Sequence, residues 1–131
     1  MAPSPIWRIM ADPLAILLIS GGHERAHYAF MVASAAAAIG RPVVLFATNQ
    51  GCHALRADLS AFAEAEAAMT ARGVASLAVL REACIEMQVR LIACEAGLRI
   101  AGLQGGLCPE VEISGLVTFL TAAPNAQTIT L

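Results

Sequence analysis

The sequence predicts an α/β fold in which helices cover both faces of a five-stranded parallel sheet. Three observations predict it: short continuous apolar runs, glycines or prolines beside them, and helical segments between them. Continuous apolar runs are typical of strands that are buried on both faces, as in parallel sheets. Strand and helix alternate five times along 131 residues, with no internal repeat and no low-complexity linker. We therefore expect a single domain.

The first strand and the first helix are marked by the glycines that follow the strand. Residues 14–20, LAILLIS, form a continuous apolar run that ends at Gly21 and Gly22. Residues 24–39 have helical composition and are stopped by a Gly-Arg-Pro sequence. Residues 1–13 hold three prolines, so we expect them to form an irregular lead-in.

The middle of the chain predicts one further strand and two helical regions. Residues 42–48, PVVLFAT, predict the second buried strand. Residues 52–73, rich in alanine and glutamate, predict one or two short helical pieces with a mobile joint. In residues 74–88, four apolar side chains fall at helical spacing and predict the buried face of a helix. These side chains are Leu77, Leu80, Cys84 and Met87.

The last third of the chain predicts three more strands. Residues 90–94, RLIAC, predict the third strand, which a short helix closed by glycines follows. Residues 111–114, VEIS, predict the fourth strand. A helix is expected through residues 115–123 and a final strand at residues 128–131, TITL.

The composition is unusually apolar for a chain of this kind. Hydrophobic residues make up 58% of it and charged residues 14%, whereas about a quarter of a typical soluble domain is charged. No apolar run reaches the ~20 residues that a membrane-spanning helix needs, so we expect no membrane span. We interpret the surplus of apolar residues as part of a subunit interface. The apolar face of the first helix is expected to serve partly the core and partly a subunit contact: Tyr28, Met31, Val32, Ala35 and Ala38.

Charge and cysteine content exclude several other classes of function. The net charge of −2 provides no basic surface, so we expect no nucleic-acid partner. Asp12 and Pro13 interrupt the only candidate for the apolar part of a signal peptide, so a cytoplasmic location is expected. The four cysteines form no C-x-x-C pair, and thus indicate neither a thioredoxin motif nor a zinc knuckle.

Ligands of parallel sheets bind outside the carboxyl ends of the strands, which directs attention to four short segments. They are Ser20–His23, Thr48–Cys52, Cys94–Glu95 and Ser114.

Residues 23–27, HERAH, spell H-E-x-x-H, the motif of zinc proteases. In such enzymes the motif lies inside a long helix, and catalytic zinc needs a third protein ligand. Here the motif begins a helix, and the only other histidine is His53. We therefore expect no metal and no other cofactor, and interpret the motif as the corner between a strand and a helix, with Glu24 at the positive end of the helix dipole. A second interpretation is that Gly21, Gly22 and the following amides line a small anion pocket, with His23 as a candidate binding residue. A zinc site that combines the two histidines of the motif with a cysteine is the alternative.

Cys94 is the strongest candidate for a reactive residue. It ends a predicted strand, and Glu95 opens the next helix. Backbone N–H groups and the helix dipole at such a position favour the thiolate, the form that a sulfur acceptor or a redox cysteine needs. Cys52 follows the second strand in the same way, and His53 beside it is able to stabilise a thiolate or shuttle a proton. If strands two and three are neighbours, Cys52 approaches Cys94. The structural alternative for both is a packed, inert thiol.

The other two cysteines are interpreted as structural. Cys84 lies on the apolar face of its predicted helix and is expected in the core. Cys108 lies in the loop QGGLCPE, where we expect an inert thiol, with a relaying thiol on a mobile loop as the alternative.

Three stretches of the chain resemble the DsrE/DsrF-like family of small sulfur carriers, which includes the Tus-type sulfur relay subunits. They are ILLISGGHERAHYAFMVASAAAAIGRPVVLFAT, VRLIACEAGLRIAGL and CPEVEISGLVTFLTAAPNAQTITL. Together they cover most of residues 14–131, and residues 52–73 match poorly.

The resemblance implies an α/β/α sandwich that assembles into a homo-oligomer, a trimer or a hexamer. It also implies that Cys94 accepts sulfane sulfur from a donor protein, holds it as a persulfide, and passes it to an acceptor thiol, as a persulfide sulfurtransferase does. Cys52 is the candidate for a second thiol. The chain departs from the family at Gly97, where relatives often carry a serine whose hydroxyl can bind the sulfur. The alternative function is a non-catalytic module that binds a small ligand or a protein at Gly21–His23, Thr48–Cys52 and Cys94.

Overall fold

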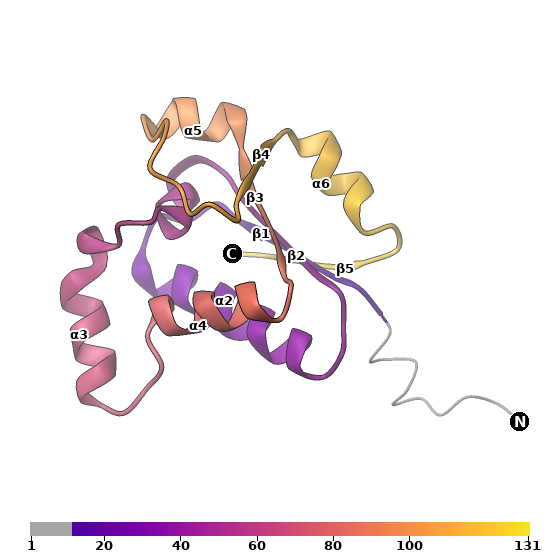
Figure 1. The fold of residues 1–131 in the computed structure, drawn as a ribbon. Helices are drawn as coiled ribbons and strands as arrows, with labels where there is room; N and C mark the ends of the chain where they lie inside the picture. Colours follow the sequence, from indigo (N-terminus) through magenta and orange to yellow (C-terminus); the bar gives the residue numbers. More distant parts are fainter. Residues whose placement is uncertain (1–11) are drawn as a thin grey trace, which may run out of the picture.

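A computed structural model describes residues 12–131 (Figure 1). Apart from Asp12 and Pro13, the expected irregular lead-in lies outside the described residues. Five strands form one sheet in the order β4-β3-β2-β1-β5, and every neighbouring pair is parallel. The strands are β1 (Leu14–Leu18), β2 (Val43–Ala47), β3 (Arg90–Cys94), β4 (Glu112–Ser114) and β5 (Gln127–Thr130). The predicted five-stranded parallel sheet is confirmed.

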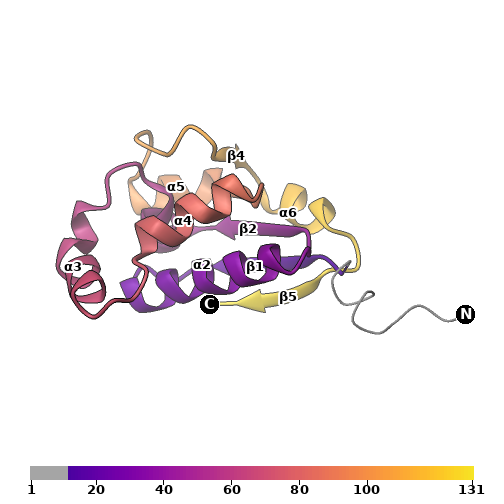
Figure 2. The same cartoon turned by 60° about the horizontal axis from the view of Figure 1, so that its bottom comes forward.

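Helices lie on both faces of this sheet. They are α2 (His23–Ala38), α3 (Ala63–Ala71), α4 (Leu77–Glu86), α5 (Glu95–Ala101) and α6 (Leu116–Ala122), with the 3-10 turns η1 (Asn49–Leu55) and η2 (Ser60–Phe62). Helices α2 and α4 pack side by side on one face, and α6 lies on the other (Figures 1 and 2). Helix α5 lies at the carboxyl edge of the sheet against η1. The helical pieces predicted in residues 52–73 are found as the end of η1, η2 and α3. No described helix combines the length and the apolar character that crossing a membrane requires.

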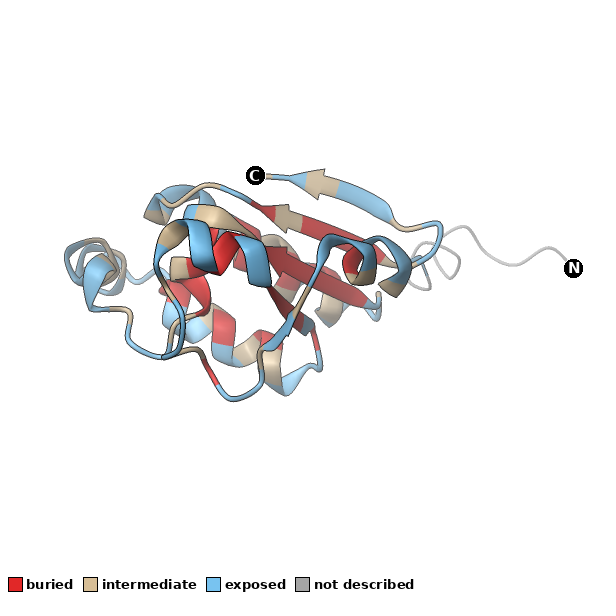
Figure 3. Ribbon diagram, turned by 90° about the horizontal axis from the view of Figure 1, so that it is seen from above, coloured by how far each residue is buried: buried red, intermediate tan, exposed pale blue. Residues whose placement is uncertain are grey.

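The sheet divides the core into two clusters of unequal size. Alternate side chains of a strand point to opposite faces, so Ile16 and Leu45 enter the larger cluster beneath α2 and α4. Phe46 and Ile92 enter the smaller one, where Phe119 is the only buried residue that α6 contributes. All of β2 is buried, as the red central strand in Figure 3 shows. The face beneath α6 is therefore the more thinly covered one.

The core face of α2 differs from the predicted one. Tyr28, Ala35 and Ala38, expected to serve partly the core and partly a subunit contact, are exposed, and Tyr28 shows 55% of its surface. The helix instead buries Ala26, His27, Ala29, Phe30, Ala33 and Ala36. The reason is that alanine recurs on every side of this helix, so that apolar spacing does not single out one face. In the observed orientation, α2 buries Phe30, which is the largest apolar side chain that the helix places in the core.

The buried face of α4 also corrects one expectation. Met87 is 38% exposed, whereas Arg81, which is not part of the predicted apolar face, is buried. The Arg81 Nη1 donates to the carbonyl oxygens of Ala54 at 2.9 Å and Arg56 at 2.6 Å. These carbonyls lie at the end of η1, where backbone acceptors need partners that the turn itself does not supply. The guanidinium thus fixes η1 to α4.

Candidate functional site

Cys94 is the last residue of β3 and the N-cap of α5, as the sequence predicted. Its backbone is extended, and its Sγ accepts a hydrogen bond from the backbone N–H of Gly97 at 3.3 Å. Free N–H groups in the first turn of a helix are donors without an intrahelical partner. A donor at this position stabilises negative charge on the sulfur relative to the neutral thiol.

A hollow of about 470 Å³ opens beside Cys94. It is bordered by the first turns of two helices and is lined, besides Cys94, by Glu95, Ala96, Arg99, Gly115 and Leu116. In the sheet, Ser114 of β4 lies opposite Cys94 and leads directly into the second of these helices. Cys94 itself is 9% exposed, so the sulfur is shielded from bulk water but borders a space that a small molecule can enter.

Gly97 lets the first turn of α5 pack closely against the start of η1. A Cβ added to Gly97 would lie 2.4 Å from both the Asn49 backbone nitrogen and the Thr48 Oγ1. Real Cβ atoms essentially never come that close to a neighbour. The absence of a serine hydroxyl at this position therefore has a structural reason. The backbone N–H of Gly97 contacts the sulfur in its place.

Cys52 lies at the same edge of the sheet but belongs to the other core cluster. Strands β2 and β3 are neighbours, with Ala47 opposite Ala93. The Cys52 Sγ donates to the Ala47 carbonyl oxygen at 3.5 Å and is fully buried in the larger cluster, whereas Cys94 packs in the smaller one. Burial raises the pKa of the Cys52 thiol to about 11; the charge of Cys94 adds to the rise, and its backbone amide opposes it. Cys52 is therefore a protonated thiol at neutral pH.

The remaining cysteines are free and buried. Cys84 contacts the Phe30 carbonyl oxygen at 3.7 Å in the core, and burial raises its pKa to about 12. Burial also raises the pKa of Cys108, and Arg81 opposes this rise. Both environments are those of structural thiols.

The predicted binding residues lie in three places. Glu95 borders the hollow beside Cys94 and forms an exposed ion pair with Arg99 at 3.1 Å. Gly21, Gly22 and His23 lie instead at the start of α2, where His23 borders a different hollow, of about 420 Å³, between α2 and α3. His53 pairs with the Gln50 side-chain oxygen at 3.1 Å within η1.

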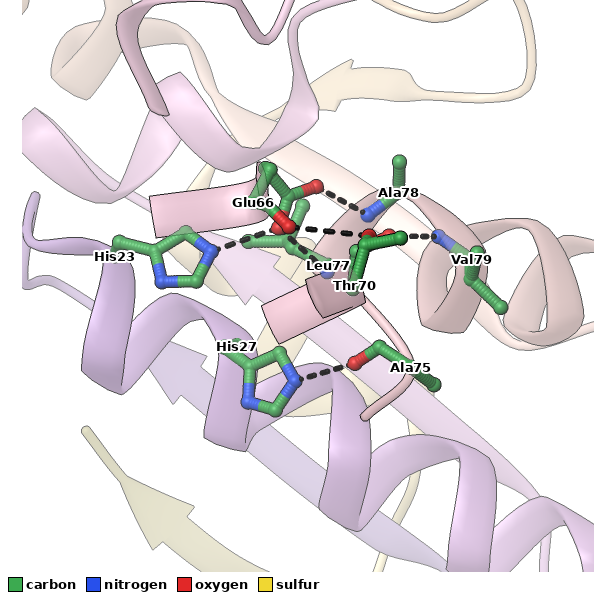
Figure 4. A network of polar contacts seen from close by, with 9 residues as sticks. His23, His27, Glu66, Thr70, Ala75, Leu77, Ala78 and Val79 are labelled. Atoms are coloured by element: carbon green, nitrogen blue, oxygen red, sulfur yellow. Dashed lines mark hydrogen bonds and ion pairs between the residues drawn. The ribbon is translucent and has the colours of Figure 1, made fainter. Parts of the chain in front are cut away.

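The two histidines of the H-E-x-x-H sequence have separate partners (Figure 4). His23 Nε2 pairs with Glu66 Oε2 at 2.8 Å, and His27 Nε2 with the Ala75 carbonyl oxygen at 2.8 Å. Their rings stack with centroids 5.7 Å apart. Among residues 12–131, no three His, Cys, Asp or Glu side chains are grouped so that they could hold a metal ion. The motif is thus part of a polar network, which sequence spacing did not reveal because Glu66 is 43 residues from His23.

Large apolar side chains are exposed on the two helices that border the Cys94 hollow, and Leu116 also lines the hollow. We call them the α5–α6 surface: Ile100, Leu116, Val117 and Leu120. Each of them exposes more than half of its area, and Val117 exposes 75%. The sequence predicted an apolar surplus and a subunit contact on α2, but it did not indicate this second surface, since the helices that carry it are only one to two turns long.

Comparisons with known proteins agree with the fold. The crystal structure of the ychN protein from E. coli is similar, with a TM-score of 0.70 at 16% sequence identity, over 92% of this chain and 99% of that one. At this identity the likeness shows the fold alone. No curated protein matches the chain. The model of the DsrE/DsrF-like family matches residues 13–131, which is nearly the whole chain. The chain therefore belongs to the DsrE/DsrF-like family.

Proposed function

We propose that the protein is a sulfur carrier that holds sulfane sulfur as a persulfide on Cys94. Membership of the DsrE/DsrF-like family supports a role in sulfur relay in general. The observation that carries the proposal is the position of Cys94. Its sulfur accepts the Gly97 N–H and borders a hollow large enough for a small sulfur compound or the tip of a partner's cysteine. Free thiols fit a reducing compartment, so we place the protein in the cytoplasm.

The transfer is an exchange at sulfur. The Cys94 thiolate attacks the outer sulfur of a donor persulfide, a new S–S bond forms, and the donor leaves as a thiolate. An acceptor thiolate then attacks the outer sulfur on Cys94, and Cys94 leaves as a thiolate. Each step breaks one S–S bond and forms another, so no external oxidant or reductant is needed. The Gly97 N–H stabilises the thiolate of Cys94 both as attacking and as leaving group.

Sulfur loading tests this proposal. After incubation with polysulfide, the intact mass of the wild type is expected to increase by one sulfur atom that a reductant removes. Cys94→Ser is expected to gain none, and Cys108→Ser, a matched control in a buried loop position, is expected to load like the wild type. Equal loading of Cys94→Ser and wild type would remove Cys94 from the mechanism. Absence of loading in every form would favour the non-catalytic binding module.

We infer that copies of the chain associate through the α5–α6 surface, in a trimer or a hexamer. Four large side chains there are more than half exposed, and the sheet face beneath α6 is thinly covered. Contiguous exposed apolar side chains on a monomer indicate an association site. Because Leu116 of this surface lines the Cys94 hollow, association through it would further limit access of water to the sulfur.

A charge in this surface is expected to dissociate the assembly. Val117 is 75% exposed, and Val117→Asp puts a carboxylate at this position. The carboxylate would have to lose its water when the interface forms. Sedimentation velocity is expected to show a smaller species than the wild type at micromolar concentration. Val79→Asp, at a position 58% exposed on α4 in the opposite layer, serves as the control and is expected to sediment like the wild type. A monomeric wild type, or dissociation by the control alone, would contradict the placement.

A further inference from the structure

Helix α3 is weakly packed against the rest of the molecule. None of its nine residues is buried, and the helix lies at one side of the fold (Figure 1). Local stability depends on buried apolar contacts, so a helix without them opens more easily than its surroundings. Polar contacts of one side chain, Glu66, hold it in place.

The Glu66 carboxylate joins three helices through both of its oxygens (Figure 4). Oε2 accepts the backbone N–H of Leu77 at 2.8 Å and pairs with His23 Nε2 at 2.8 Å, while Oε1 accepts the N–H of Ala78 at 2.9 Å. Leu77 and Ala78 are the first two residues of α4, where free N–H groups and the helix dipole favour a negative charge. Hydrogen bonds to an ionised group are about twice as strong as neutral ones.

His23 connects the same contact to the segment that precedes α3. Its ring meets the Phe62 ring edge to face, with centroids 5.4 Å apart, and Phe62 is the N-cap of α3. Gly73 follows the C-terminal end of α3, in an exposed turn. Its φ is +72°, and there is open space around it. The helix is thus bounded by a glycine turn that can act as a hinge and by an aromatic contact that His23 provides.

We propose that α3 is a hinged segment that opens while the sheet stays folded, that the Glu66 carboxylate holds it closed, and that opening uncovers His23 and the first turn of α4. His23 is the charged or titratable side chain that faces Glu66 from α2, and α4 faces it with backbone N–H groups. Burial opposes ionisation, but the hydrogen bonds from His23, Ala78 and Leu77 lower the pKa of Glu66 overall. The closed form is therefore favoured above the ordinary carboxyl range and is lost as the pH falls through the lowered pKa.

Hydrogen exchange with the full chain tests the proposal. In the wild type at pH 7, the amides of α3 are expected to exchange faster than those of β1, β2 and β3. In Glu66→Gln, which removes the charge and one acceptor oxygen, exchange of α3 and of the Leu77 and Ala78 amides is expected to rise by at least about tenfold, with the sheet unchanged. Trypsin cleavage after Arg72, in the exposed turn, is expected to accelerate in parallel.

Glu64→Gln is the matched control, because Glu64 lies exposed on the same helix and makes none of these contacts. It is expected to exchange like the wild type. Unchanged exchange of α3 in Glu66→Gln would overturn the proposal. So would a rise that extends through the sheet, because that would mean global destabilisation. Sulfur loading of Glu66→Gln is expected to match the wild type, since the Cys94 hollow has no residue in common with this network.

Discussion

Gly97→Ala is expected to destabilise the protein by about 3 kcal/mol, because the added methyl group has no space. Its Cβ would lie 2.4 Å from the Asn49 nitrogen and 2.9 Å from the Thr48 Cα. Both are backbone atoms, so a rotamer change cannot relieve the contact. The first turn of α5 and the start of η1 must separate, which also moves the N–H that contacts Cys94. Urea denaturation should show the loss as a lower midpoint at unchanged slope.

Gly22→Ser is the control for this substitution. Gly22 is the N-cap of α2, and a Cβ there meets nothing within 4 Å. Serine is a good N-cap, so the stability of the Gly22→Ser variant is expected to stay within about 0.5 kcal/mol of the wild-type value. If Gly97→Ala unfolds at the same urea concentration as this control, the close approach of α5 and η1 is not a constraint. Gly97→Ser meets the same contact through its Cβ and is expected to be destabilised at least as much.

Much of the fold could be predicted because its strongest signals are local. The runs that became β1, β2 and β3 are continuous and apolar, and glycine or a polar residue follows each of them. Such runs predict buried parallel strands, and parallel strands bring their carboxyl ends to one edge. That reasoning was sufficient to place Cys94 at a strand end and a helix start without knowledge of the strand order.

Contacts between distant segments could not be predicted in this way. Arg81 is buried because the carbonyls that end η1, some 25 residues earlier, need a donor. Glu66 binds His23 across 43 residues, and nothing in the local spacing of either residue indicates the other. The sequence also did not indicate which face of α2 packs on the sheet, since alanine occupies both its core face and its solvent face. In each case the deciding partner lies on another element.

The four cysteines are expected to differ in reactivity by orders of magnitude. With a pKa of about 11, roughly one Cys52 thiol in ten thousand is ionised at pH 7, and the fraction for Cys84 is smaller still. Both are also fully buried, so a reagent reaches them only after the fold opens. Cys94 borders a hollow and accepts a backbone N–H, which supplies both access and stabilisation of the thiolate. The thiolate is the form that attacks an alkylating reagent.

The rate at which iodoacetamide labels each cysteine of the folded protein at pH 7, followed by peptide mass spectrometry, tests the role of Cys94 most directly. We expect Cys94 to be labelled at least about a hundredfold faster than Cys52 and Cys84, in the wild type and in the dissociated Val117→Asp variant. All four are expected to react at similar rates in urea. If Cys94 in both folded proteins is labelled as slowly as Cys52 and Cys84, its sulfur is neither reachable nor ionised, and it cannot carry sulfur.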